Sequence, residues 1–125
     1  MLPNGRTVGS YVNQVSKSVN MGNSPAMPAF MSNPIGTAQQ VYSGTNFRKM
    51  FGGPGANYFF LGDAGNFAYG AVSANIGVPL SIAEFVAGSY ASVAHQASDR
   101  VGPYGMDQSA TINVPKGYNA KCTIP

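Results

Sequence analysis

The residue types best suited to chemistry gather in a glycine-rich stretch near the middle of the chain. Asp63, Asn66 and Gly70 share one face if this stretch is helical, and Tyr69 lies one step from that line. A carboxylate, an amide and a phenol at this spacing can polarise a water molecule or a sugar hydroxyl. Gly65 and Gly70 weaken a helix, which marks them as candidate positions for close approach of a substrate or a neighbouring backbone. In the structural alternative, Asp63 only caps a helix and Tyr69 is a core aromatic.

A second carboxylate follows a turn near the C-terminus. The segment GPYG at residues 102–105 predicts a tight, rigid turn, and Asp107 and Gln108 lie on the loop after it. Two carboxylates are the minimum set for glycoside hydrolysis. Asp63 and Asp107 are therefore the candidate catalytic pair, with Tyr104 and Gln108 as candidate substrate contacts. The alternative is that Asp107 is an ordinary solvated turn residue.

Three further residues are weaker candidates for chemistry. Glu84 is explained by a capping box with Ser81, and His95 lies off the core stripe of its helix. Cys122 lies close to the C-terminus, where side chains are poorly positioned. With one His, one Cys and four acidic residues, the chain predicts no metal site. It also lacks a GxGxxG or phosphate-binding loop, so no cofactor is expected.

Length and composition indicate a single domain spanning residues 1–125. Apolar residues make up 44% of the chain, enough for one core, whereas only 9% are charged, far below the usual quarter. The net charge of +3 is spread along the sequence, and only Arg48 and Lys49 are adjacent basic residues. Proteins that bind nucleic acids usually cluster their basic residues, so this composition does not favour such a partner.

Apolar residues recur at helical spacing in the N-terminal part of the chain. Residues 21–34 then form a proline-rich stretch that predicts an irregular linker, anchored by Met27, Phe30 and Met31. Thr45 is the predicted N-cap of a short helical turn, and a brief buried run follows at residues 58–61. A first helix of about a dozen residues is predicted from the stripe Val8, Tyr11, Val12, Val15 and Val19.

The central part of the chain predicts a helical hairpin over residues 64–98. Asp63 would cap its first helix, residues 64–75, and the Ser81 capping box would open the second. Gly70 and Gly88 would let the two helices approach closely. After Pro103 the chain is expected to be irregular, with at most one short strand at residues 111–114. We therefore predict a small, mainly α (or α+β) domain, with the hairpin packed on an N-terminal helix.

Three segments resemble the bacterial polymorphic toxin type 44 family. They are FRKMFGGPGANYFF, then GDAGNFAYGAVSANIGVPL, and finally GPYGMDQSATINVPKGY. The family pattern has a GGP element, a D-x-G-N-x-x-Y-G-A motif, a helix and a late GP[FY]GxD segment. The resemblance covers about residues 46–120, and the sequence departs from the pattern after Met106. The matching positions are Asp63, Gly65, Asn66, Tyr69, Gly70, Pro103, Gly105 and Asp107.

The resemblance implies a toxin used in competition between bacteria. Such domains form the C-terminal part of large Rhs-type exported proteins, pass into a target bacterium through the carrier and its secretion apparatus, and are neutralised by a cognate immunity protein. The sequence begins without a charged leader and apolar run, which fits a segment cut from a longer exported protein. A toxin family does not define one reaction, because unrelated chemistries occupy the same position in these proteins.

Three hypotheses for the reaction follow. The first is hydrolysis of the cell-wall glycan in the periplasm, with Asp63 and Asp107 as acid and base and Asn66 and Tyr69 orienting the substrate. It is favoured because the chain is weakly charged and rich in aromatic residues.

The third hypothesis is a hairpin that depolarises the membrane without being an enzyme. Residues 64–83 carry no charge, which is long enough for a membrane span, although polar residues and Pro79 interrupt that stretch.

The second hypothesis is a cytoplasmic nuclease, most plausibly an RNase. It would use Asp63 with His95 for chemistry, while basic side chains bind the RNA phosphates. The basic candidates for this role are Arg48, Lys49 and Arg100. Their scatter along the chain counts against this hypothesis.

Overall fold

The computed structural model describes residues 2–21, 34–90 and 102–120. Within these ranges the chain is helical and contains no strand, which confirms the predicted mainly α class. Met27, Phe30 and Met31 lie outside the described residues, as do residues 91–98 at the end of the predicted hairpin. The elements are α1 (Val8–Met21), α3 (Pro34–Gly44), α4 (Phe47–Phe51), α5 (Tyr58–Asn75), α6 (Leu80–Tyr90), the 3-10 helix η2 (Pro103–Gly105) and α7 (Gln108–Ala120).

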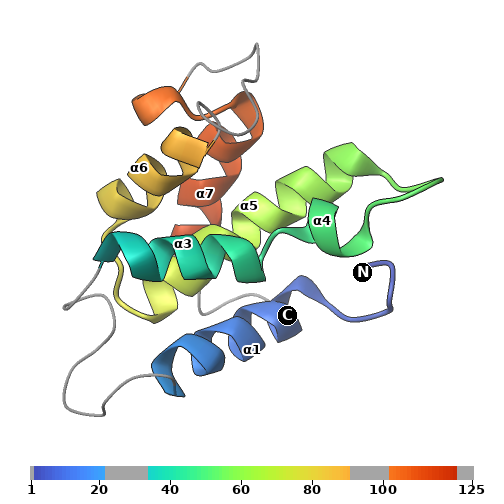
Figure 1. Cartoon of the computed structure of the whole chain (residues 1–125), viewed down its shortest axis with the longest axis horizontal. Coiled ribbons are helices and arrows are strands. Elements are labelled where there is room, and N and C mark those ends of the chain that lie inside the picture. The colour runs from blue at the N-terminus through green and yellow to red at the C-terminus, as the bar shows by residue number, and fades with distance from the viewer. Residues whose placement is uncertain (1, 22–33, 91–101, 121–125) are drawn as a thin grey trace.

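Helix α5 is the central element. It contacts α1 on one side and α6 and α7 on another, and its most extensive contact is with α7 (Figure 1). Nearly every side chain from Ala68 to Ala74 is buried, so α5 is apolar around most of its circumference. No helix among the described residues is long and apolar enough to cross a membrane.

The core draws on every long helix around α5. Each large, fully buried side chain in it contributes about 1.5–3 kcal/mol to folding. The predicted stripe of the first helix is confirmed for Tyr11, Val12 and Val15, which are buried. Other fully buried members of the core are Val41, Phe47, Leu61, Val72, Met106 and Val114.

The first turn of α5 differs from the prediction. The helix begins at Tyr58, where the Asn57 side chain accepts a hydrogen bond from the Phe60 N–H at 3.1 Å. The predicted cap, Asp63, is therefore a residue within the helix. The run predicted as buried forms this first turn, and Phe59 is 83% exposed, with only Leu61 enclosed. Because Asn57 caps the helix about two turns earlier, Asp63 is not needed as its N-cap.

Two other predicted caps are also wrong. The N-cap of α4 is Asn46, which accepts from the Lys49 N–H at 3.2 Å, while the Thr45 hydroxyl donates to the Val41 carbonyl at 2.9 Å. Helix α6 begins at Leu80, one residue before Ser81, because the amide groups that follow bond to the Pro79 carbonyl. The predicted stop between α5 and α6 is confirmed, with Gly77 at φ 85°.

The segment after Pro103 is more regular than predicted. Residues 108–120 form helix α7, not an irregular segment with a short strand. Thr111, Ile112 and Val114 are β-branched and favour a strand over a helix. Pro115 also opposes a helix, because Pro inside a helix costs about 3 kcal/mol. The helix forms because Asp107 caps it and because its apolar face, which includes Ala110 and Val114, packs on α5.

The close backbone contact of α5 is with α7, not with the other helix of the predicted hairpin. A Cβ atom at Gly70 would overlap the Val114 carbonyl oxygen, and one at Gly117 would overlap the Phe67 carbonyl oxygen. The predicted contact between Gly70 and Gly88 is wrong, because Gly88 lies against the backbone of Tyr104. The small residues permit close approach, but to different partners.

This contact predicts that alanine at Gly70 or Gly117 destabilises the fold. The overlap with backbone atoms outweighs the gain in helix propensity of about 1 kcal/mol, so we expect each variant to lose about 1–3 kcal/mol of unfolding free energy. Gly44→Ala is the matched control, since its Cβ would meet only the Val15 side chain. Urea unfolding followed by circular dichroism measures the three variants. Equal stability of Gly70→Ala and Gly44→Ala would contradict the close contact.

Candidate functional site

A polar groove of about 620 Å³ follows the line where α5 meets α7. Asp63 and Asn66 reach it from α5, and Ser109 and Asn113 reach it from α7. Phe59 and Ile112 add exposed apolar surface at its wall. The groove also receives Arg48 from α4, Asp107 and Gln108 from the start of α7, and Lys116 from its later turns. It therefore collects charged and amide side chains from three helices.

Asp63 is held by hydrogen bonds from the facing helix. Its Oδ1 accepts from the Ser109 hydroxyl at 2.6 Å and from Asn113 Nδ2 at 3.3 Å. The same Ser109 hydroxyl accepts from Asn66 Nδ2 at 3.0 Å. This chain of bonds orients both Asp63 and Asn66, while the second carboxylate oxygen of Asp63 makes no hydrogen bond within the described part of the chain.

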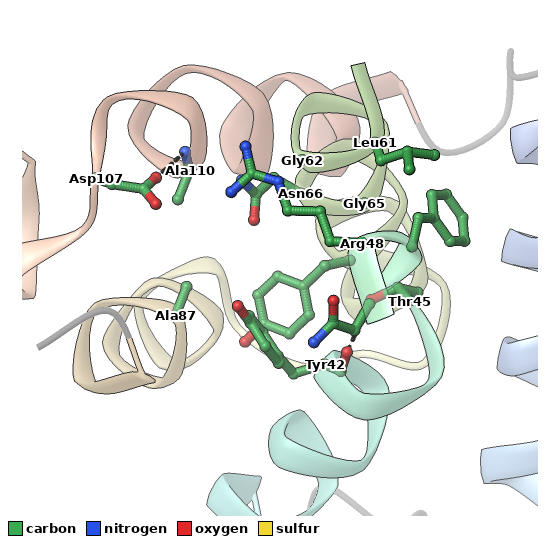
Figure 2. Close-up of a pocket in the computed structure, with 13 residues that line it drawn as sticks. Tyr42, Thr45, Arg48, Leu61, Gly62, Gly65, Asn66, Ala87, Asp107 and Ala110 are labelled. Atoms are coloured by element: carbon green, nitrogen blue, oxygen red, sulfur yellow. Dashed lines mark hydrogen bonds between the residues drawn. The ribbon is translucent and has the colours of Figure 1, made fainter. Parts of the chain in front are cut away.

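A smaller chamber of about 50 Å³ lies behind the groove, between α3, α4, α5, α6 and the start of α7. Figure 2 shows Tyr42, Arg48, Asn66 and Asp107 directed toward this space. Arg48, Asn66 and Asp107, with Gly62, also line the groove. These shared residues form the wall between the two spaces, so a group bound in one lies beside the other.

Arg48 is fixed in position by α5. Its Nε donates to the Tyr58 carbonyl at 2.7 Å. Its guanidinium lies over Gly62, where a Cβ atom would be 2.7 Å from the nearest terminal nitrogen. Arg48 forms no ion pair with a carboxylate among the described residues. A fixed guanidinium with its terminal nitrogens free of protein acceptors can bind an anionic group of a ligand.

Asp107 serves as the N-cap of α7. Its Oδ1 accepts from the Ala110 N–H at 2.8 Å, and its carbonyl accepts from the Thr111 hydroxyl at 2.7 Å. It is thus a half-buried helix cap and not a freely solvated turn residue. The Oδ2 atom makes no hydrogen bond within the described residues, so the carboxylate can cap the helix and still meet a ligand.

Tyr69 lies deeper than its predicted role requires. It is 1% exposed, and its hydroxyl donates to the Ala83 carbonyl at 2.6 Å. Burial, together with the neighbouring Tyr42, raises the pKa of its phenol far above the ordinary value. Its ring packs edge-on against Tyr42, with centroids 5.5 Å apart. Tyr69 therefore lines the chamber through its ring and supports Tyr42.

Tyr42 brings a second phenol to the chamber. Its hydroxyl makes no hydrogen bond within the described residues. Burial raises the pKa of Tyr42, and the charges of Tyr90 and Asp107 raise it further, whereas Arg48 opposes the increase. The phenol therefore stays protonated at neutral pH and can donate a hydrogen bond to a ligand.

The predicted substrate contacts fall in different places. Gly65 lines the chamber and Gln108 lines the groove. Gly70 contacts the α7 backbone instead of an open surface. Tyr104 lines neither space; it is 53% exposed and packs edge-on against Phe85 at 5.7 Å.

The weaker candidates do not join this site in the described residues. Glu84 lies on α6 outside the groove and the chamber, and partial burial raises the pKa of its carboxyl. His95 and Cys122 lie outside the described residues. No group of three His, Cys, Asp or Glu side chains that could hold a metal ion is found in the part of the chain that the structure describes.

Sequence reasoning missed several contributors to the site. The sequence prediction did not include Tyr42, Ser109 or Asn113, and it placed Arg48 only in the nuclease hypothesis. Ser109 and Asn113 are four residues apart, so a helical α7 would have placed them on one face. Arg48 and Tyr42 come from other helices, and only the tertiary fold brings them to the chamber.

No protein-family model matches the chain, and no curated protein or solved structure gives a significant match.

The capping bond of Asp107 predicts different effects for two substitutions. Asp107→Ala leaves the Ala110 N–H without its acceptor and should lower the free energy of unfolding by about 0.5–2 kcal/mol. Asp107→Asn keeps a capping oxygen and should stay close to the parent protein, because Asn is as good an N-cap as Asp. Thermal and urea unfolding of both variants measure the difference. Equal losses in the two variants would show that the charge, not the cap, stabilises α7.

Proposed function

We propose that the chain is the toxin domain of an exported antibacterial protein and that it hydrolyses the bacterial cell-wall glycan in the groove between α5 and α7. The observation that carries this proposal is the position of Asp107, in the wall shared by the groove and the chamber. Asp63 lines the same groove. Two carboxylates in one polar groove fit the acid and base of glycoside hydrolysis.

The hydrogen bonds suit these roles. Each carboxylate has one oxygen held by the protein and one free of partners within the described residues. A fixed orientation lets a carboxyl group give or take a proton at a defined position. Asn66, held by Ser109, would orient a sugar hydroxyl. Tyr69 would act through Tyr42, because its own hydroxyl is bound to Ala83.

The polar groove also suits the other partners of such a toxin. A cognate immunity protein that covers the α5–α7 groove would block access to both carboxylates. The domain would reach the periplasm of the target cell on an Rhs-type carrier. The runner-up function is an RNase, and the observation that favours it is the presence of Arg48 and Lys116 beside the carboxylates.

The proposal predicts that killing depends on compartment and on both carboxylates. Directed to the periplasm of a test bacterium, the parent chain should cause lysis, whereas cytoplasmic expression should not. Asp63→Asn and Asp107→Asn should each lower the rate of glycan release from purified cell walls by about 10²- to 10⁴-fold, because each removes an acid–base group. The measurements are lysis curves and soluble sugar released from the walls.

Glu84→Gln is the matched control, since it removes one carboxylate outside the groove and should keep full activity. Far-ultraviolet circular dichroism checks that each variant is folded. Degraded RNA with intact cells after cytoplasmic expression would overturn the cell-wall proposal and establish the nuclease instead. Full activity of both aspartate variants would show that the groove is not the active site.

A further inference from the structure

We propose that the chamber behind the groove binds a carboxylate group of the substrate and that Arg48 is its anchor. This inference rests on the proposed function and specifies the substrate as glycan strands whose lactyl carboxylates are free, because a stem peptide on that carboxyl converts it to a neutral amide. Arg48, Tyr42 and Asn46 line the chamber and supply the hydrogen-bond donors.

Arg48 presents one edge of its guanidinium to a ligand. The Nε is already bonded to the Tyr58 carbonyl, which leaves the two terminal nitrogens. That edge matches the two oxygens of a planar carboxylate in a bidentate pair. The support from Gly62 and Tyr58 holds the guanidinium before the ligand arrives, so little side-chain freedom is lost on binding.

Tyr42 and Asn46 add neutral donors. The Tyr42 phenol is protonated, and its hydroxyl has no hydrogen-bond partner within the described residues. The Asn46 oxygen accepts from the Lys49 N–H at 3.2 Å, which leaves its NH₂ group as a donor. A carboxylate has about four acceptor sites, so it can use Arg48 and these donors together.

Size and charge favour a carboxylate over a phosphate. A volume of about 50 Å³ holds a small planar group but excludes a sugar ring. For comparison, one water molecule needs about 10–15 Å³. Asp107 lines the same chamber and would repel a doubly charged phosphate monoester more than a singly charged carboxylate. A singly charged phosphodiester is disfavoured by size instead, because its tetrahedral group and two ester oxygens are bulkier than a planar carboxylate. The sugar itself would lie in the groove, with its carboxylate in the chamber.

The test is a nuclear magnetic resonance titration of the full chain with two monosaccharides. N-acetylmuramic acid carries a carboxylate, and N-acetylglucosamine is its neutral counterpart. We expect the acid to shift the side-chain signals of Arg48 Nε–H and Asn66 Nδ2, and the neutral sugar to bind at least about tenfold more weakly. Stronger shifts with inorganic phosphate or AMP than with the acid would overturn the carboxylate assignment and favour a phosphate group as the ligand of the chamber.

Variants test the anchor itself. Arg48→Gln should weaken binding of the acid by at least about tenfold, and Tyr42→Phe by about threefold to tenfold. Arg48→Lys keeps the charge but loses the bidentate edge, so it should not restore full affinity. Arg6→Gln is the matched control, because it removes the same charge near α1 and should bind like the parent. Unchanged affinity in Tyr42→Phe and Arg48→Lys together would overturn the proposal.

This outcome is distinguishable from failure of the proposed function. If cell walls are cleaved but Arg48→Lys leaves KM and the titration unchanged, the carboxylate site is wrong and the hydrolase stands. If the acid binds through Arg48 but walls remain intact, the site stands and the hydrolase is wrong.

Discussion

The backbone contact between α5 and α7 sets the geometry of the whole site. Helices usually pack with their axes 8–10 Å apart, at a distance set by the side chains between them. Gly70 and Gly117 remove those side chains, so each helix meets a backbone carbonyl of the other. Short side chains can then bridge the helices, as Ser109 does to Asp63 and Asn66. A wider separation would leave these groups bonded only to water.

A second constraint holds the start of α7. Tyr104 has a positive φ of 60°, an uncommon conformation for a residue with a side chain. Its backbone lies against Gly88 of α6, and the Gly102 N–H bonds to the Met106 carbonyl at 3.0 Å. Met106 is fully buried, so the residue before Asp107 is anchored in the core. This turn sets where the capping carboxylate enters the chamber, and it links α6 to the site although α6 contributes few groups to it.

The sequence predicted the fold class and some boundaries because those depend on local signals. Apolar spacing identifies the first helix, and Gly77 with Pro79 identifies the stop after α5. Helix α7 was missed because its β-branched residues and Pro115 oppose a helix locally, and the gain comes from packing on α5. The start of α5 was missed because Asn57, a cap as good as Asp63, lies earlier in the chain.

The candidate site shows the same division between local and tertiary signals. Spacing and resemblance selected Asp63, Asn66 and Asp107, and the structure brings all three to one groove. For Tyr69 the structure matches the alternative of a core aromatic, because the side chain is buried and its hydroxyl donates to the Ala83 carbonyl. The sequence suggested Arg48 only as a phosphate-binding residue of a nuclease, since the glycine that makes room for its guanidinium is fourteen positions along the chain, on another helix.

Charged side chains are scarce in this chain, and several of them gather at the groove. The chain has only four acidic residues, and two of them, Asp63 and Asp107, line this groove together with Arg48 and Lys116. Among the described residues these charges form no ion pairs with one another, and an exposed pair would add only about 0–1 kcal/mol of stability. Folding alone does not require charged side chains to gather in one place and stay unpaired. A groove that presents both signs of charge can bind an anionic group through a cation and still offer a carboxylate for proton transfer.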